Sequence, residues 1–356
     1  MYKNSLIRSY RYGDEKKMDD LFNVVFKKER DLKTWTWKFS DNPNHAEHVI
    51  AVAESGGEII GMYPSWGRYY KFGNDLILTL QPIENCVHPD FRGGGRVFIR
   101  LYHEWRKRAV NLGAKFAFGF PTDDHFKIGR RLLGYRVLFS VPVLYKRLNL
   151  RLAFRNRFHN IFLERLVYLI SNRLYRMLYS ISGMMSQKRF EIERVYSFDK
   201  GYDRFWSKVS QRYGIIGIRD SAYLNWRYVQ HSKKGYAIFR SIRDGEVQGY
   251  IILKVLDIDP GERVGFIVDL LAIDNEDLIG GLLTAGITYL LSEEVDCVKI
   301  LIENNLIYNY MIKNGFKKRD EPLPVAYELY DKNIDEAFLR NRDNWFLSYS
   351  DTDLID

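Results

Sequence analysis

A glycine-rich loop in the first half of the chain combines residue types that bind anions. The loop follows an apolar stretch that predicts a strand, and it leads into a helix predicted over Gly95–Leu112. Glycine has no side chain, so the backbone can approach a ligand and direct its N–H groups at it. The start of the helix adds N–H donors and a partial positive charge, and Arg92 and Arg96 add formal charge. The loop therefore suits a diphosphate, although a glycine run alone is also typical of a plain turn.

The residues around this loop follow a specific order. The string RGGGRV spans Arg92–Val97, with a Val and a Pro shortly before it. This order resembles the acetyl-CoA loop of the GNAT superfamily of N-acetyltransferases, whose signature is Arg or Gln, two residues, Gly, one residue, and then Gly or Ala. The chain departs from the signature at Val97, where the family has a small residue. The resemblance covers residues 1–150, including IRSYRYGDEKKMDDLF, IIGMY and the segment Lys127–Tyr135, and extends more faintly over residues 190–330.

The resemblance implies that acetyl-CoA is the acyl donor, that an amine is the acceptor, and that no metal takes part. The residues that it places against the cofactor are Asn85, Cys86, Val87, Arg92, Gly93, Gly94, Gly95, Arg96 and Val97. The backbone of the first three would face the acyl group, where an N–H group can stabilise the developing oxyanion.

Two side chains are candidates for proton transfer in such a reaction. The acceptor amine must lose a proton, and Glu84, on the strand before the loop, is the candidate general base. The alternative for Glu84 is a structural carboxylate that faces solvent or pairs with an arginine. Many family members place a proton-donating Tyr where this chain has Arg130. His125 is the nearest ionisable substitute, and the alternative is an ordinary surface histidine.

The two halves of the chain repeat one pattern. DLKTWTWKF from Asp31 and DSAYLNWRY from Asp220 align without a gap at an offset of 189, and a Gly-Glu turn recurs at an offset of 188. Each half then closes with a predicted helix that runs into a glycine-aromatic pair, at Gly134 and at Gly315. Three features in the same order indicate two copies of one mixed α/β fold.

We therefore predict two tandem GNAT-type domains, each a mostly antiparallel mixed sheet flanked by helices. The predicted segments are an acetyl-CoA-binding domain over 1–149, a basic amphipathic helical connector over 150–190, a degenerate domain over 191–333 and a C-terminal tail over 334–356. The second domain is called degenerate because Val268–Gly286 contains no counterpart of the glycine loop. Its acidic residues, Asp274, Glu276 and Asp277, would repel a diphosphate, so we predict one cofactor for each chain.

Trp37 and Trp226 occupy equivalent positions in the two halves, each followed by a basic residue. A tryptophan beside a cation could stack on a sugar or a nucleotide. Because the pair recurs in the half that lacks the cofactor loop, we predict that both tryptophans pack in the core.

The connector is strongly basic. Arg147–Arg189 contains eight Arg and one Lys against a single Glu, which accounts for +8 of the net charge of +9. One helical face carries Phe162, Leu166, Ile170, Leu174, Met177 and Ile181. An apolar face flanked by arginines is typical of a helix at a membrane interface, and equally of a helix packed on its own protein. We predict packing, and weak association of 150–190 with an anionic membrane surface is the alternative.

Composition excludes several classes of protein. With 356 residues, 46% of them hydrophobic and 28% charged, the chain is long enough for about two folded domains and is not disordered. Cys86 and Cys297 lie far apart without metal-ligand spacing, which excludes a disulfide framework and a zinc site. The basic excess lies in one segment rather than over the domains, so we expect no nucleic-acid binding. No signal peptide is apparent, and we expect a cytoplasmic protein.

These features predict transfer of an acetyl group from acetyl-CoA to an amine. The expected acceptor is an amino sugar or a polysaccharide precursor, and the basic charge would suit an acidic acceptor such as a nucleotide sugar or a polysaccharide precursor. Two alternatives stay open. One is a Fem-type aminoacyl-tRNA-dependent transferase, which has a tandem GNAT fold but needs no CoA diphosphate loop. The other is a non-catalytic acyl-CoA-binding sensor or scaffold.

Overall fold

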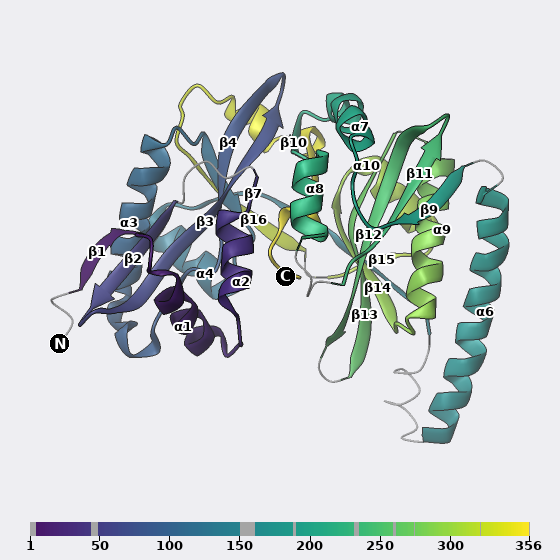
Figure 1. Cartoon of the computed structure of the whole chain (residues 1–356), viewed down its shortest axis with the longest axis horizontal. Coiled ribbons are helices and arrows are strands. Elements are labelled where there is room, and N and C mark those ends of the chain that lie inside the picture. The colour runs from purple at the N-terminus through teal and green to yellow at the C-terminus, as the bar shows by residue number, and fades with distance from the viewer. Residues whose placement is uncertain are drawn as a thin grey trace. The chain divides into compact units, whose positions relative to one another are not determined.

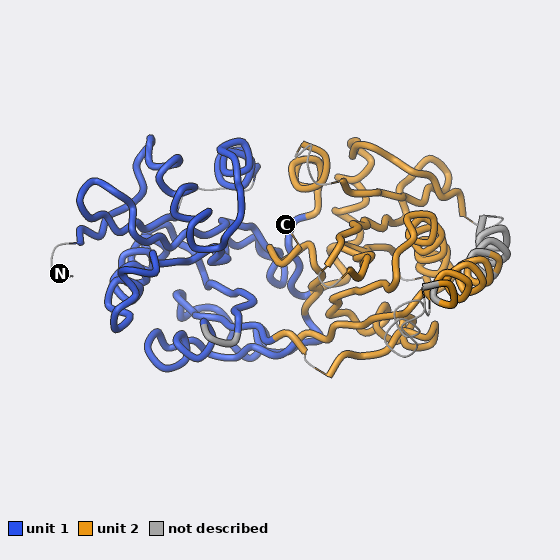
Figure 2. The backbone as a smooth tube through the Cα atoms, turned by 90° about the horizontal axis from the view of Figure 1, so that it is seen from below, with its two compact units in different colours: residues 1–140, 214–218, 324–344 blue, residues 141–213, 219–323, 345–356 orange. Residues whose placement is uncertain are grey.

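The computed structural model describes residues 5–43, 49–149, 161–187, 190–230, 235–258, 261–273, 275–320 and 322–355. The chain divides into two compact units (Figure 2). Unit 1 contains residues 1–140, 214–218 and 324–344, and unit 2 contains residues 141–213, 219–323 and 345–356. Neither unit is continuous in sequence.

Unit 1 is built around a mixed sheet. Its strands are β1 (Leu6–Ser9), β2 (Ile50–Ser55), β3 (Glu58–Phe72), β4 (Asp75–Pro82), β5 (Cys86–Val87), β6 (Phe116–Gly119), β7 (Arg136–Val141), β10 (Ile215–Gly217) and β16 (Leu323–Leu329). The main order is β1-β2-β3-β4-β6-β16-β7, with β4 and β6 parallel and the neighbours from β1 to β4 antiparallel. Its helices are α1 (Glu15–Phe26), α2 (Leu32–Trp35), α3 (Arg96–Asn111), α4 (Asp123–Ile128) and α11 (Glu336–Arg340).

Helices cover both faces of this sheet, and β3 is therefore buried on both faces along most of its length. Figure 1 shows α1 and α2 in front of the sheet and α3 behind it. α3 presents one apolar face to the sheet, formed by Val97, Leu101, Tyr102, Trp105 and Ala109. These residues recur at helical spacing and are almost completely buried, so the face anchors the start of α3 beside the strands.

Unit 2 repeats this order of elements. Its strands are β8 (Val143–Arg147), β9 (Glu191–Val195), β11 (Ala237–Arg243), β12 (Glu246–Ile258), β13 (Glu262–Ala272), β14 (Cys297–Glu303), β15 (Lys317–Lys318) and β17 (Trp345–Ser348). The main order is β9-β11-β12-β13-β14-β8-β15, with β13 and β14 parallel. Its helices are α6 (Ile161–Gln187), α7 (Gly201–Val209), α8 (Ser221–Tyr228), α9 (Glu276–Ser292) and α10 (Asn305–Lys313). The predicted mixed α/β class, with helices flanking mostly antiparallel sheets, is confirmed.

The two halves of the sequence exchange one strand each. β8 follows β7 in the chain but pairs with β14 and β15 of unit 2, whereas β16 follows β15 but pairs with β6 of unit 1. The units therefore differ from the continuous boundaries drawn at 1–149 and 191–333. The segment 334–356 is likewise not a separate tail, because its first part belongs to unit 1 and β17 pairs with β14. A repeat pattern follows the order of the chain and carries no information about which sheet a terminal strand joins.

The repeated tryptophans pack as predicted. Trp37 and Trp226 are 4% and 2% exposed, and both belong to the core. They lie on the two short segments that begin with a capping aspartate, Asp31 in unit 1 and Asp220 in unit 2. Each aspartate accepts a hydrogen bond from the backbone three residues later, which explains why both segments start a helix at the same point of the repeat.

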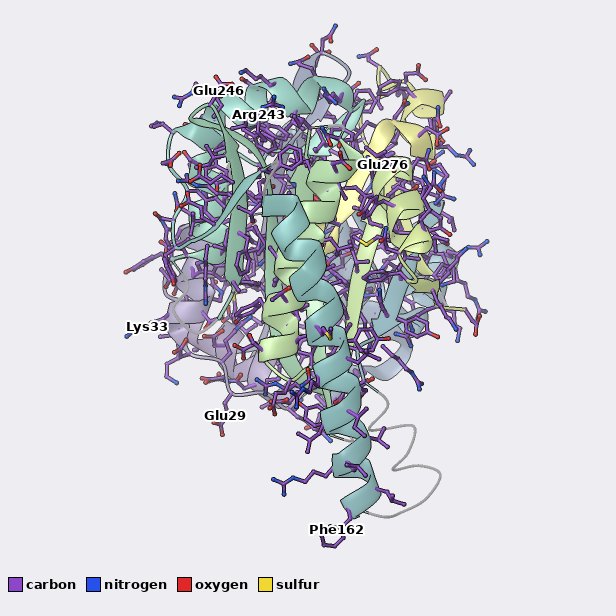
Figure 3. The ribbon with its side chains drawn as sticks, turned by 90° about the vertical axis from the view of Figure 1, so that its right-hand side faces the viewer. Glu29, Lys33, Phe162, Arg243, Glu246 and Glu276 are labelled. Atoms are coloured by element: carbon purple, nitrogen blue, oxygen red, sulfur yellow. The ribbon has the colours of Figure 1, made fainter. Side chains whose placement is uncertain are left out.

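The connector helix α6 differs from its prediction. It packs along α9 (Figure 3), but Phe162, Leu166, Ile170 and Leu174 are 87%, 53%, 61% and 56% exposed. The prediction that this apolar face packs against the protein is therefore wrong for these four side chains. Helical periodicity finds the apolar face but does not say on which side of the helix the protein lies. Residues 150–160 and the side chain of Ile181 lie outside the described part of the structure.

Candidate functional site

A backbone irregularity separates β4 from β5 at the centre of unit 1. Ser65 of β3 lies opposite Pro82, whereas Met62 lies opposite Cys86, so the strand that contains Glu84 carries one extra residue. Glu84 has a φ angle of 54°, in the left-handed region that few non-glycine residues adopt. The irregularity is a β-bulge, and it takes the backbone around Glu84 out of the regular ladder.

The ladder between β4 and β6 ends next to this bulge. The parallel ladder between them joins Thr79 to Phe116 and Leu80 to Ala117, while β4 runs on to Pro82 and β6 to Gly119. Proline has no N–H group to donate to a ladder, which fits the end of β4. The ladder therefore ends directly before the bulge, and Pro82 and Gly119 remain neighbours there, since a Cβ atom on Gly119 would lie 3.8 Å from the Pro82 carbonyl oxygen.

The glycine loop is open on its outer side. Gly94 and Gly95 both have φ angles of 69°, and a Cβ atom on either would meet no described heavy atom within 4 Å. Both glycines are therefore required by the backbone conformation rather than by crowding. Arg92 donates a hydrogen bond from Nε to the carbonyl of Val87 at 2.9 Å, and the Gly95 N–H donates to the carbonyl of Arg92 at 3.2 Å. These bonds tie the loop to β5.

The start of α3 is uncapped and carries no acid. Within the described residues, no side chain caps this helix, and its first turn contains no Asp or Glu. Its N–H groups and the positive end of its dipole are therefore directed at the open side of the loop. Arg96, at the first position of the helix, is exposed. Val97 is 7% exposed and packs in the core, so its departure from the family signature does not crowd the loop.

Glu84 is not an isolated carboxylate. It forms ion pairs with Arg30 and with Lys38, whose Nζ atom lies 2.5 Å from Glu84 Oε1. The three side chains are 6% to 8% exposed. Burial alone would raise the pKa of Glu84, but the two cations outweigh it and hold the pKa below its ordinary value. Glu84 is therefore ionised at neutral pH and is a weaker base than a free carboxylate.

Asp19 of α1 completes this cluster. Arg30 donates from Nε to Asp19 Oδ1 at 2.6 Å, so two carboxylates and two cations are buried together with no net charge. Burial raises the pKa of Asp19 to about 6, although Arg30 opposes the shift. None of Asp19, Arg30 and Lys38 was predicted as a site residue. Lys38 was visible as the basic residue of the repeated triplet, but no sequence pattern pointed to Asp19 or Arg30.

Asn85 and Cys86 lie on the strand side of the bulge. With its amide nitrogen as donor, Asn85 bonds to the carbonyls of Ile83 and Pro64 at 3.2 Å each. Cys86 is a buried thiol on β5, and burial raises its pKa to about 12. The thiol is therefore protonated and unreactive at neutral pH. The Asn85 amide braces the bulge, and the backbone role predicted for both residues toward an acyl group stays a prediction.

His125 lies among aromatic rings at the start of α4. Its ring centroid is 5.4 Å from that of Phe98 and 6.0 Å from that of Tyr135. The Tyr135 hydroxyl bonds in turn to the hydroxyl of Tyr63. Burial lowers the pKa of His125 to about 4, so the imidazole is uncharged at neutral pH. This state disfavours the proton-donor role predicted for it, since only the imidazolium is a ready donor.

Among the comparisons with known proteins, only the one with solved structures identifies the architecture. No protein-family model matches the sequence, and no curated protein matches it. Among solved structures, a probable N-acyltransferase from Enterococcus faecalis is 13% identical, with a TM-score of 0.61 over 92% of this chain and 73% of its own. A GCN5-related N-acetyltransferase from Anabaena variabilis has the same TM-score and coverage at 12% identity. The N-myristoyltransferase of Saccharomyces cerevisiae with bound myristoyl-CoA is 10% identical, with a TM-score of 0.59 over 93% of this chain and 83% of its own.

The chain has the GNAT fold. The resemblance seen in the sequence is thereby confirmed at the level of the fold. The described residues contain no group of three or more His, Cys, Asp and Glu side chains that could hold a metal ion. They also contain no helix that is both long and apolar enough to cross a membrane.

The matching position of unit 2 lacks the features of the GNAT loop. α9 follows β13 as α3 follows β5, but Asn275 caps it by accepting a hydrogen bond from the N–H of Leu278 at 3.0 Å. Glu276 and Asp277 stand in its first turn. The donors that α3 leaves open are thus partly satisfied in α9, and acidic charge surrounds them.

Proposed function

We propose that this protein transfers an acyl group from acyl-CoA, and that unit 1 holds the CoA diphosphate. The observation that carries the proposal is the open loop at Gly94 and Gly95, which leads into the uncapped start of α3. The residues present fit a diphosphate, because the start of α3 supplies backbone donors and a helix dipole and carries the exposed Arg96. We place the remainder of the donor beside the end of the ladder between β4 and β6.

We further propose acetyl-CoA as the donor and an amine as the acceptor. The loop sequence supports this choice through its likeness to N-acetyltransferases, and one structural neighbour carries that name. The neighbour with bound myristoyl-CoA shows that this architecture also accommodates a long acyl chain in another protein. An amino sugar or a polysaccharide precursor that carries an amine is the acceptor class that we favour and that the amine panel tests first.

The experiment that tests this function measures binding and turnover separately. Calorimetric titration with acetyl-CoA, myristoyl-CoA and free CoA gives the affinity for the nucleotide and the effect of the acyl chain. Release of the CoA thiol is then followed across a panel of amines that includes amino sugars. We expect binding of all CoA compounds and thiol release with acetyl-CoA and at least one amine. Failure of every CoA compound to bind would overturn the proposal and would reopen the aminoacyl-tRNA-dependent alternative.

Glu84 is our proposed general base, and its ion pairs make the usual test ambiguous. Glu84→Gln removes the base but also leaves Lys38 buried without its charged partner, which costs about 3 kcal/mol or more of stability. The double variant Lys38→Met with Glu84→Gln removes the pair together and leaves the pair of Asp19 with Arg30 in place. We expect the double variant to recover much of the stability and to remain slow. Recovery of activity along with stability would make Glu84 a structural residue.

A non-catalytic acyl-CoA-binding protein is the second candidate, and one observation favours it. Both predicted proton-transfer residues are held in poorly reactive states, Glu84 by two cations and His125 by burial. Such a protein would bind acetyl-CoA through the same loop without releasing thiol in the presence of any amine. Tight binding with no turnover across the amine panel would establish this candidate over the transferase.

A further inference from the structure

The connector helix α6 is amphipathic in the reverse sense. We define its outer face as Leu166, Leu169, Ile170, Leu174 and Met177, which are 53% to 62% exposed. Leu166, Ile170, Leu174 and Met177 recur at intervals of four, four and three, and Leu169 follows Leu166 by three. All five therefore lie on one side of the helix. Phe162, at the end of the helix in Figure 3, points away from the rest of unit 2. A surface helix normally turns such a row toward the core, since each large side chain gains stability by leaving water.

The opposite face of α6 is the less exposed one, and its two most buried described side chains are polar. Ser171 and Asn172 are each 9% exposed. The Ser171 hydroxyl donates to the carbonyl of Val167 at 2.7 Å, and the Asn172 amide donates to the Tyr168 hydroxyl at 2.7 Å. This less exposed face lies toward the protein, where α6 packs along α9. The helix is therefore held on unit 2 by a face other than its outer face.

Charge identifies what covers the outer face. Arg165 and Arg173 are exposed on α6, and the surrounding segment Arg147–Arg189 carries a net charge of +8. A second copy of the chain placed face to face would bring two such segments together, and their repulsion opposes that arrangement. An anionic surface is complementary. No described helix is long and apolar enough to span a membrane, so α6 would lie on the surface rather than cross it.

We propose that α6 docks this protein on an anionic lipid surface. The outer face enters the boundary between headgroups and acyl chains, and Arg165 and Arg173 remain at the level of the lipid phosphates. The arrangement explains why the apolar residues point outward and why the basic charge is confined to this segment. It does not depend on the catalytic function, since α6 belongs to unit 2 and the glycine loop to unit 1.

The experiment is sedimentation of the full chain with vesicles. Vesicles of phosphatidylcholine alone are compared with vesicles that contain about one-third phosphatidylglycerol, at low and high salt. We expect binding to the anionic vesicles at low salt and its loss at high salt, because screening weakens attraction at the surface. Equal binding to both kinds of vesicle, or binding that salt does not change, would overturn the role given to the arginines.

Two variants test whether vesicle binding needs the outer face specifically or any exposed apolar side chain. The double variant Leu166→Glu with Ile170→Glu should lower the vesicle-bound fraction about tenfold. Its melting temperature should not change, because both side chains are exposed. Leu76→Glu is the matched control, since Leu76 is an equally exposed leucine of unit 1, at 59%, and its loss should leave binding unchanged. Equal effects of the two variants would overturn the proposal. The proposal would also be overturned if the wild-type protein formed a dimer that did not bind vesicles and the double variant were monomeric. That result would assign the outer face to contact with a second copy of the chain.

Discussion

The starts of α3 and α9 occupy the same place in two units with the same order of elements, and they are built in opposite ways. α3 lies in the chain between β5 and β6, and β6 runs parallel to β4. α9 lies between β13 and β14, which run parallel to each other. α3 begins after two left-handed glycines. In the described structure it has no capping side chain and no acidic residue in its first turn. α9 begins at the cap Asn275 and continues with Glu276 and Asp277.

The difference shows how one scaffold gains or loses an anion site. Every helix has four N–H groups at its start that need acceptors. In α9 a side chain supplies one acceptor and two carboxylates oppose an incoming anion. In α3 the acceptors must come from solvent or from a ligand. The units therefore need differ at only a few positions for one to bind a diphosphate and the other to contribute structure.

The first way to break the comparison is to close the loop of α3. Gly95→Glu places a side chain and a negative charge on the side where the donors converge. It should weaken acetyl-CoA binding at least about 100-fold, which corresponds to about 3 kcal/mol. Calorimetric titration measures the effect, and circular dichroism checks the fold. The substitution also strains the backbone and lowers the free energy of unfolding, because a non-glycine residue at a φ angle of 69° costs on the order of 1 kcal/mol.

Gly56→Glu provides the matched control for that strain. Gly56 lies in the turn between β2 and β3 and has a φ angle of 60°, and a Cβ atom there would likewise meet no described heavy atom within 4 Å. The two variants should lose similar stability, and only Gly95→Glu should lose affinity. Full affinity in a folded Gly95→Glu protein would show that the loop does not hold the diphosphate.

A second way to break the comparison is to count the sites. If the cap and the acids of α9 exclude a diphosphate, saturation with acetyl-CoA should give one ligand for each chain. Calorimetry and native mass spectrometry both report this ratio. A ratio of two would mean that Asn275, Glu276 and Asp277 do not exclude the ligand, and that the two helix starts are functionally alike.

Much of the architecture could be predicted from the sequence, because it rests on local patterns. The repeat at Asp31 and Asp220 corresponds to two helix caps with the same hydrogen bond, and the glycine run corresponds to two left-handed residues. The exchange of β8 and β16 could not be predicted, since strand pairing depends on contacts distant in sequence. The outward orientation of α6 was mispredicted for the same reason.

The chemistry of the site was predictable only in part. Glu84 was found from its place on the strand before the loop. Its environment was not, because Asp19 and Arg30 reach it from α1 and from the segment after α1, 65 and 54 residues earlier in the chain. The state of His125 was also hidden, because its low pKa arises from burial beside Phe98 and Tyr135 rather than from any neighbour in sequence.

A third test sharpens the picture of what covers α3. His125 packs on Phe98 of α3 with its pKa lowered to about 4, whereas an unfolded chain titrates near 6.5. Between these values the unfolded state binds more protons, so the free energy of unfolding should fall as pH drops from 7 to 5, by about 2 kcal/mol from this residue. In urea denaturation, the free energy of unfolding of His125→Phe should therefore fall by about 2 kcal/mol less than that of the wild type between pH 7 and pH 5. His103→Phe, at an exposed site of α3, should keep the wild-type dependence.

The smallest expected effect concerns the cap of α9. Asn275→Ala removes the acceptor for the N–H of Leu278 and should lower the free energy of unfolding by about 1 kcal/mol, as measured in urea. It should not create a second acetyl-CoA site, because Glu276 and Asp277 still oppose an anion and no left-handed glycines precede the helix. Asn304→Ala, which removes the corresponding cap of α10, should cost a similar amount and serves as the control. An unchanged stability in Asn275→Ala beside a normal loss in Asn304→Ala would mean that the start of α9 does not depend on its side-chain cap. The contrast with α3 would then rest on acidic charge alone, and replacing Glu276 and Asp277 by their amides would become the decisive variant.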